Sequence, residues 1–364
     1  MAQADGRPAD AVALLWQLHR RDRANLDVAN RLLGLLRQLG DDAQIEALVD
    51  SLDRWANSTQ RRVTVARLLV HHDLNQQALS MTNGYARQGG DADADARLVR
   101  AVALWQMGQR QQASEALALV KRGRPASAGP SVPVVAWAAE TLIGQGALGP
   151  ADALIAAATT TTPDDPSLQL VRAHSLAARG DHAQAVRICN KAAEAAPGNL
   201  AVQIDLAIAL DRAGRWQEAV ARAEAVLRDH PAHVDAINLI GYVLADRNHD
   251  LQRAGKMIRV ARQLAPLRPD IIDSQGWLSF RRGELTQARR ALVIAHRFTP
   301  DDPVVLVHLA EVDAALGHGH EAIAGFQHAL RLCRDPAQCA RWRGRLRALR
   351  HAGPPDAATK DSSR

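Results

Sequence analysis

The segment SLQLVRAHSLAARGDHAQAVRICNKAAEAAP, from Ser167 to Pro197, contains one complete structural unit of this 364-residue chain. Before Gly180 its apolar residues recur at three- and four-residue spacing, and the same spacing resumes from Ala185 to Ala196. This periodicity predicts two amphipathic helices. Gly180 tolerates the left-handed conformation that ends a helix, and Pro197 cannot continue the second helix because it has no amide donor. The segment is therefore predicted to be a helix-turn-helix hairpin.

The unit recurs along the chain with a nearly constant period. Prolines that end successive units are 34 or 35 residues apart, at Pro163, Pro197, Pro231, Pro266 and Pro300. Small residues keep the same interval in the first helix (Ala139, Ala173, Ala207, Gly241, Gly276 and Ala310) and in the second (Ala151, Ala185, Ala219, Ala254, Ala288 and Ala322). Larger side chains there would overpack the helix contact and cost about 1–3 kcal/mol. The period predicts stacked units that bury their apolar faces against one another.

In these features the chain resembles the tetratricopeptide repeat family, whose 34-residue units have small residues in both helices and a closing proline. The resemblance implies an all-α fold, a right-handed α-solenoid of antiparallel helix hairpins. The turn glycines in this register are Gly146, Gly180, Gly214, Gly283 and Gly317. One unit departs from the pattern, because Asn248, His249 and Asp250 replace the glycine and add a residue. A longer turn is expected there.

The predicted organisation has five parts: degenerate N-terminal repeats (8–120), a Pro/Gly-rich loop (121–133), the regular array (134–334), a capping helix (335–350) and a disordered tail (351–364). The loop is the expected internal boundary. Residues 8–21 are expected to form a second helix without its first, and residues 28–57 a degenerate hairpin. The chain thus opens inside a unit, so either a lone helix caps the stack or upstream sequence is missing.

The predicted capping helix has one apolar and one basic face. Asp335 and Pro336 are a good helix start, since they place an N-cap acceptor before a proline at the first helical position. Cys339 and Trp342 begin the apolar stripe, and the rest is largely basic, with Arg341, Arg343, Arg345, Arg347 and Arg350. Cys333 and Cys339 are six residues apart, so a disulfide is geometrically plausible. Alternatively, both thiols pack beneath Trp342.

Composition argues against several classes of protein. The chain is 47% hydrophobic but only 3% aromatic, and it has no apolar run of about 20 residues as a membrane span requires. Its net charge is +6, but the arginines are spread over many helices, which disfavours nucleic acid. Neither His71-His72-Asp73 nor His318-Gly319-His320-Glu321 has a third metal ligand that can be placed. We therefore expect no enzyme, cofactor or metal site.

The family resemblance places the candidate binding residues on first helices, which in that family line a concave groove. They are Asn238, Tyr242, Asp246, Asp273, Trp277, Phe280 and Arg281. Aromatic anchors ringed by polar groups are typical of binding hot spots. With Asp235 and Asp270 nearby, the patch predicts a partner segment with apolar and basic side chains. The alternative is that the aromatics only fill gaps between successive hairpins.

Two classes of function remain open at the level of sequence. The first is a non-enzymatic scaffold that binds a protein or peptide partner in the groove. The second is an accessory subunit that recognises a glycan or a nucleic acid through the groove aromatics or the arginine-rich end helix. Residues 237–300 also resemble the last repeats of proteobacterial cell-envelope members of the family. That resemblance implies a periplasmic or membrane-associated scaffold, for which peripheral membrane association is an option, whereas a complete N-terminus as given would imply the cytoplasm.

Overall fold

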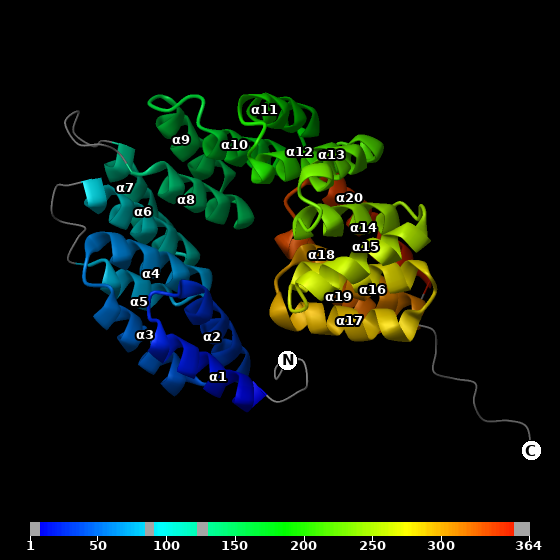
Figure 1. Cartoon of the computed structure of the whole chain (residues 1–364), viewed down its shortest axis with the longest axis horizontal. Helices are drawn as coiled ribbons and strands as arrows, with labels where there is room; N and C mark the ends of the chain where they lie inside the picture. Colours follow the sequence, from blue (N-terminus) through cyan, green and yellow to red (C-terminus); the bar gives the residue numbers. More distant parts are fainter. Residues whose placement is uncertain (1–7, 84–90, 122–129, 353–364) are drawn as a thin grey trace, which may run out of the picture. The chain divides into compact units, whose positions relative to one another are not determined.

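The structure, a computed structural model, describes residues 8–83, 91–121 and 130–352 (Figure 1). These residues form twenty α-helices and no strand. The chain divides into two compact units, Met1–Arg172 and Ala173–Arg364. The division falls inside a helix of the repeat array and not at the loop of residues 121–133 that the sequence favours. Residues 122–129 of that loop lie outside the described part.

The first unit contains the N-terminal helices. They are α1 (Pro8–Arg21), α2 (Leu26–Leu39), α3 (Asp42–Trp55), α4 (Thr59–His71), α5 (Asn75–Met81), α6 (Asp91–Gln106), α7 (Arg110–Lys121), α8 (Val132–Gly144) and α9 (Leu148–Thr159), while α10 (Pro166–Ala178) crosses the division. The predicted lone helix is α1, which packs on α2. The predicted degenerate hairpin is α2 with α3, and Gly40 between them has a φ of 66°.

The second unit contains the most regular repeats. Its helices are α11 (His182–Ala195), α12 (Leu200–Arg212), α13 (Trp216–Asp229), α14 (Val234–Asp246), α15 (Leu251–Leu264), α16 (Pro269–Arg281), α17 (Leu285–Phe298), α18 (Pro303–Ala315), α19 (Gly319–Leu332) and α20 (Pro336–Ala352). Each hairpin pairs an even-numbered first helix with the next helix, as in α14 with α15. First helices also pack on one another, α14 on α16 and α16 on α18. This is an α-solenoid.

The turns follow the predicted glycines. Gly180, Gly214, Gly283 and Gly317 have φ values of 84°, 80°, 78° and 83°, a region that favours glycine. The irregular turn between α14 and α15 has four residues, 247–250, where the neighbouring turns have three. Asn248 and Asp250 take positive φ values of 52° and 41° there, and Asp250 caps α15 by accepting from the Arg253 amide at 3.0 Å. The prediction of a longer turn is confirmed.

The small residues lie where the two helices of a hairpin touch. A Cβ built on Gly241 would lie 2.6 Å from Ile258 Cγ1. A Cβ on Gly276 would lie 2.6 Å from Leu292 Cγ and 3.2 Å from the Ala288 carbonyl oxygen. Side-chain carbons do not approach one another this closely, so the spacing between the helices depends on the missing Cβ atoms.

Helix α20 ends the array as the sequence predicts. Trp342 and Leu346 are buried against α18 and α19, where they meet Leu306, Val307 and Phe326. Arg345 pairs with Glu311 of α18 at 2.8 Å. The helix continues to Ala352, so residues 351 and 352 of the predicted tail are helical. Its remaining residues, 353–364, lie outside the described part of the chain.

Replacing Gly276 by alanine is expected to lower the free energy of unfolding by about 1–3 kcal/mol, because the added Cβ would overlap Leu292. Urea denaturation followed by circular dichroism would measure the loss. Gly344→Ala on α20 is the matched control, since nothing lies within 4 Å of its added Cβ. Alanine should leave stability unchanged there or raise it by up to about 1 kcal/mol. Equal denaturation midpoints for the two variants would contradict the steric explanation.

Candidate protein-interaction face on the first helices

The predicted binding residues lie in two matching rows on α14 and α16. Asn238, Tyr242 and Asp246 are spaced by four residues along α14, so they share one face of that helix. The residues 35 positions later, Asp273, Trp277 and Arg281, form the same row on α16, and Phe280 lies beside them. We call this set, with His308 of α18, the first-helix face.

An aromatic stack connects three helices at this face. The Trp277 ring stacks on Phe280 with 5.0 Å between centroids and on His308 with 4.0 Å between centroids. Tyr242 of α14 approaches the same histidine at 6.1 Å. Sequence reasoning missed His308, because it does not occupy one of the family's groove positions. A titratable residue in the otherwise apolar stretch Val304–Ala310 was the signal that could have identified it.

A buried polar pair fixes the orientation of that histidine. Nδ1 of His308 lies 2.9 and 3.0 Å from the two carboxylate oxygens of Asp273. An ionised carboxylate only accepts hydrogen bonds, so Nδ1 is the donor. His308 is 4% exposed and Asp273 is 5% exposed, so water does not compete for either group. The pair joins α16 to α18.

Further hydrogen bonds join α14 to α16. Trp277 Nε1 donates to Asp246 Oδ1 at 3.2 Å. Arg281 donates through Nε to the Ala245 carbonyl at 3.1 Å and through Nη2 to the carbonyl of Asp246. Its guanidinium also lies 5.1 Å from the Trp277 ring centroid, within the range of a cation–π contact. These contacts cap the last carbonyls of α14 with a cation from the next repeat.

The seven predicted residues differ in accessibility. Trp277 is only 7% exposed, and it fills the gap between successive hairpins as the alternative reading expects. Tyr242, Asp246, Phe280 and Arg281 remain partly exposed at the rim. Asn238 is buried and donates to Asp270 at 3.3 Å, while its Oδ1 has no hydrogen-bond partner among the described residues. Binding at this face stays a prediction. In it, the buried Trp277 holds the neighbouring side chains in place and does not itself contact the partner.

Tyr242 contributes a polar hydroxyl to the first-helix face. It makes no hydrogen bond within the described residues, and burial together with Asp246, Asp273 and Asp211 raises its pKa well above its usual value. The hydroxyl is therefore neutral at physiological pH, and it can both donate and accept.

The acidic border of the face is less negative than the sequence implies. Arg268 donates to both Asp235 and Asp270, and its hydrogen bond with Asp270 is the main cause of its raised pKa. Arg247 pairs with Asp211 at 2.8 Å. The arginines come from turns whose position relative to the next repeat could not be inferred from spacing alone.

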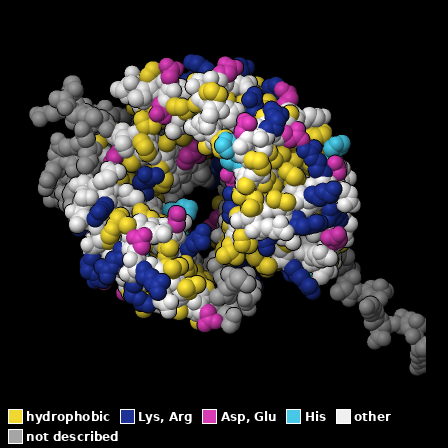
Figure 2. Space-filling model, viewed as in Figure 1, with side chains coloured by type: hydrophobic (Ala, Val, Ile, Leu, Met, Phe, Trp, Pro, Cys, Tyr) yellow, Lys and Arg dark blue, Asp and Glu magenta, His cyan; other side chains and the backbone are white. Residues whose placement is uncertain are grey.

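Charge also differs between the two helix layers of these repeats. The first helices α14, α16 and α18 carry six acidic residues and one arginine. The second helices α15 and α17 carry seven lysines and arginines and no acidic residue. Figure 2 shows Lys and Arg side chains in dark blue gathered over the region in which Figure 1 draws α15.

The irregular turn forms one wall of a pocket that sequence reasoning did not predict. This open pocket of about 260 Å³ lies between α13 and α15, with Trp216, Glu224, Leu244, His249 and Arg253 among its lining residues. The rings of Trp216 and His249 lie 5.2 Å apart. Small-molecule sites are usually about 300–1,000 Å³, so the pocket suits a single side chain better than a cofactor.

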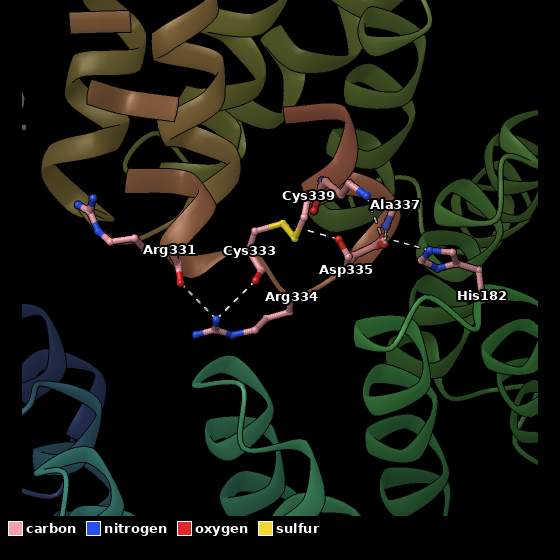
Figure 3. Close-up of a disulfide and its surroundings, with 8 residues drawn as sticks. His182, Arg331, Cys333, Arg334, Asp335, Ala337 and Cys339 are labelled. Carbon is pink, nitrogen blue, oxygen red and sulfur yellow. Dashed lines mark hydrogen bonds and ion pairs between the residues drawn. A yellow bond between two sulfur atoms is a disulfide. The ribbon is translucent and has the colours of Figure 1, made fainter. Parts of the chain in front are cut away.

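Cys333 and Cys339 are joined by a disulfide with Cα atoms 5.8 Å apart (Figure 3). The enclosed Asp335 caps α20 by accepting from the Ala337 amide at 2.9 Å. Its other carboxylate oxygen lies 3.0 Å from His182 Nε2, so the start of α20 contacts the start of α11. The remaining cysteine, Cys189, is a buried thiol whose pKa burial raises to about 12.

The other histidine clusters do not form metal sites in the described structure. Residues 8–83, 91–121 and 130–352 contain no group of three His, Cys, Asp or Glu side chains that could hold a metal ion. His72 instead donates to Asn30 of α2 at 2.7 Å, and His318 approaches Asp313 at 3.2 Å. Among the described helices, none is long and apolar enough to cross a membrane.

Comparison with known proteins agrees with this geometry. A family model described as tetratricopeptide repeat matches residues 176–241. Over 86 residues the chain is 40% identical to a TPR repeat-containing protein of Pseudomonas aeruginosa, a match that spans 24% of this chain and 14% of that protein.

Solved structures show the same fold at low sequence identity. A tetratricopeptide repeat protein of Parabacteroides merdae has a TM-score of 0.52 and 13% identity, over 71% of this chain and 98% of that one. Human IFIT1, solved as a dimer with PPP-AAAA, has a TM-score of 0.50 and 16% identity, over 75% of this chain and 68% of that one.

His308→Ala is expected to lower the free energy of unfolding by about 3–5 kcal/mol, because it leaves the buried Asp273 carboxylate without its partner. The double variant Asp273→Ala/His308→Ala should be less destabilised than the sum of the two single variants, as a double-mutant cycle by urea denaturation would measure. Additive losses would show that the pair is not coupled.

Stability is also expected to fall in acid because of His72. Burial lowers its pKa to about 4 in the folded chain, with His71 and Arg37 adding to the shift. Between about pH 6.5 and 4 the unfolded chain binds a proton that the folded chain does not, so stability decreases as the pH falls. Since the ring is only partly buried, we expect a loss of about 2 kcal/mol. His72→Gln should remove this part of the pH dependence in urea titrations, and an unchanged dependence would contradict the assignment.

Proposed function

Since the chain is built of tetratricopeptide repeats, we propose that it is a non-enzymatic scaffold that binds a segment of a protein partner on the first-helix face. Repeats of this kind generally act as protein-interaction scaffolds. The proposal rests on one observation above the others, the stack of Trp277 and Phe280 of α16 on His308 of α18, which Tyr242 of α14 also approaches. A rigid face loses little conformational entropy on binding, which favours affinity.

The rim of the stack supplies the contact surface. Tyr242 and Phe280 are partly exposed aromatic side chains, and such residues are common among binding hot spots. The free Tyr242 hydroxyl adds one directional hydrogen bond. Trp277 excludes water from beneath them, since it is buried between α14 and α18.

Charge supports a partner that is apolar with some basic character. Five aspartates border the face (Asp211, Asp235, Asp246, Asp270 and Asp273) against three arginines (Arg247, Arg268 and Arg281). Because most of these groups pair with one another, the remaining field is modest. Apolar contact should therefore contribute more of the affinity than charge does.

The second candidate function, recognition of a nucleic acid or glycan, has weaker support. The arginine-rich helix α20 buries its tryptophan, Trp342, against α18 and α19, and Arg345 is paired with Glu311. Nucleic-acid surfaces usually combine free cations with exposed stacking aromatics. Binding of RNA would fall steeply with salt, whereas peptide binding at an apolar face would not.

A peptide selected from a displayed library on the folded chain would test the proposal. Tyr242→Ala is expected to weaken its binding by about 30-fold, as for a hot-spot residue, and Tyr242→Phe by about 2–10-fold through loss of one hydrogen bond. Trp216→Ala, in the pocket of the second helices, is the control and should bind normally. Isothermal titration calorimetry measures all three. Unchanged affinity for Tyr242→Ala and Phe280→Ala, with helicity retained, would reject this face as the binding site.

A further inference from the structure

Helices α15 and α17 expose an unusual combination of side chains. Val260, Leu264 and Ile294 are 41%, 47% and 44% exposed, and they are all of the large apolar side chains that are exposed among the described residues of the second unit. Val260 and Leu264 are one turn apart on α15, and Ile294 occupies on α17 the position of Val260, 34 residues later. Both helices pack on α16, so the repeat places these side chains on one layer of the unit.

Cations flank the apolar side chains in the same register. Lys256 lies one turn before Val260, and Arg290 lies one turn before Ile294. Lys256, Arg259 and Arg290 are exposed and have no acidic partner within the described residues. Since neither helix carries an acidic residue, the charges that α15 and α17 themselves present are all positive. We call it the second-helix face.

We propose that the second-helix face docks on a bilayer surface that contains anionic lipids. A cationic surface with protruding aliphatic side chains can place the aliphatic groups at the boundary of headgroups and acyl chains while its lysines and arginines meet lipid phosphates. The exposed side chains of α15 and α17 include no aromatic residue. Protein hot spots are enriched in Trp, Tyr and Arg and poor in Leu and Val, and single-stranded nucleic acid needs stacking aromatics. Cations combined with aliphatic side chains, and without exposed aromatic residues, therefore favour a lipid surface over either of those partners. The anionic headgroups of that surface complement the positive charge of the face.

Docking by this face is separate from partner binding at the first-helix face. The second-helix face lies on α15 and α17, which carry no acidic residue, whereas Tyr242 lies on the layer of first helices, on α14. A protein held through α15 and α17 would keep the first-helix face available. Each activity can therefore be lost without the other.

Co-sedimentation with vesicles tests the proposal. The full chain should sediment with vesicles of phosphatidylcholine and phosphatidylglycerol in equal parts, should not sediment with phosphatidylcholine alone, and should dissociate as salt is raised. Lys256→Gln/Arg290→Gln should weaken binding by about 30-fold, since each cation near such a surface contributes about fivefold. Val260→Ser/Ile294→Ser should weaken it by about tenfold through loss of apolar contact.

Matched controls separate the face from general charge and from misfolding. Arg341→Gln/Arg343→Gln on α20 removes the same charge from another exposed surface, and Leu14→Ser removes an exposed apolar side chain of the first unit, 53% exposed. Both should bind vesicles normally, and all variants should keep the melting temperature of the parent. The proposal fails if the chain does not bind anionic vesicles, or if the α20 variant loses binding as strongly as the α15/α17 variants. It also fails if sedimentation equilibrium shows a dimer that the α15/α17 variants dissociate, since a second copy would then occupy the face.

Discussion

Close contact between paired helices is the constraint on which the rest of this structure depends. Gly241 and Gly276 have no room for a Cβ against Ile258 and Leu292, and buried alanines occupy the matching positions in neighbouring repeats. Because each hairpin closes at this distance, the next first helix can pack against both members of the pair. The positions of side chains on α14, α16 and α18 follow from that packing. Residues 35 positions apart in the sequence thus become neighbours on one face.

Much of the fold could be predicted because steric rules act at a fixed interval. Prolines, turn glycines and small residues each have a local physical reason, and their positions predict the hairpins, the longer turn at 247–250 and the end helix. The division of the chain at Arg172 could not be predicted this way. It depends on how many contacts join neighbouring repeats, and a local pattern does not contain that information.

The candidate site was predictable only in part, for a related reason. Tyr242, Trp277 and Phe280 stand out in the sequence as large residues at first-helix positions, but spacing does not say which of them faces a neighbouring repeat. The structure buries Trp277 against His308, and it pairs Arg268 with two aspartates that the sequence presents as free charges. Both outcomes depend on contacts between repeats. The predicted hairpin defines where side chains lie within one repeat. It does not define which side chains of the next repeat they contact.

Residues that depart from the repeat pattern are informative, because helix packing in the repeats constrains only a few positions. Helix contacts in the array require small residues, turn glycines and aliphatic fillers, and the two preceding units meet that requirement on α12 and α14 without a histidine or a Trp–His stack. The buried Asp273–His308 pair is therefore not needed to close a hairpin, although it now stabilises the junction of α16 and α18. In the same way, packing requires no particular charge on the outward positions of α15 and α17, so the absence of acidic residues there cannot be explained by the fold. The buried pair is a contact between repeats, whereas the uniform charge of α15 and α17 is the feature on which the proposed docking surface rests.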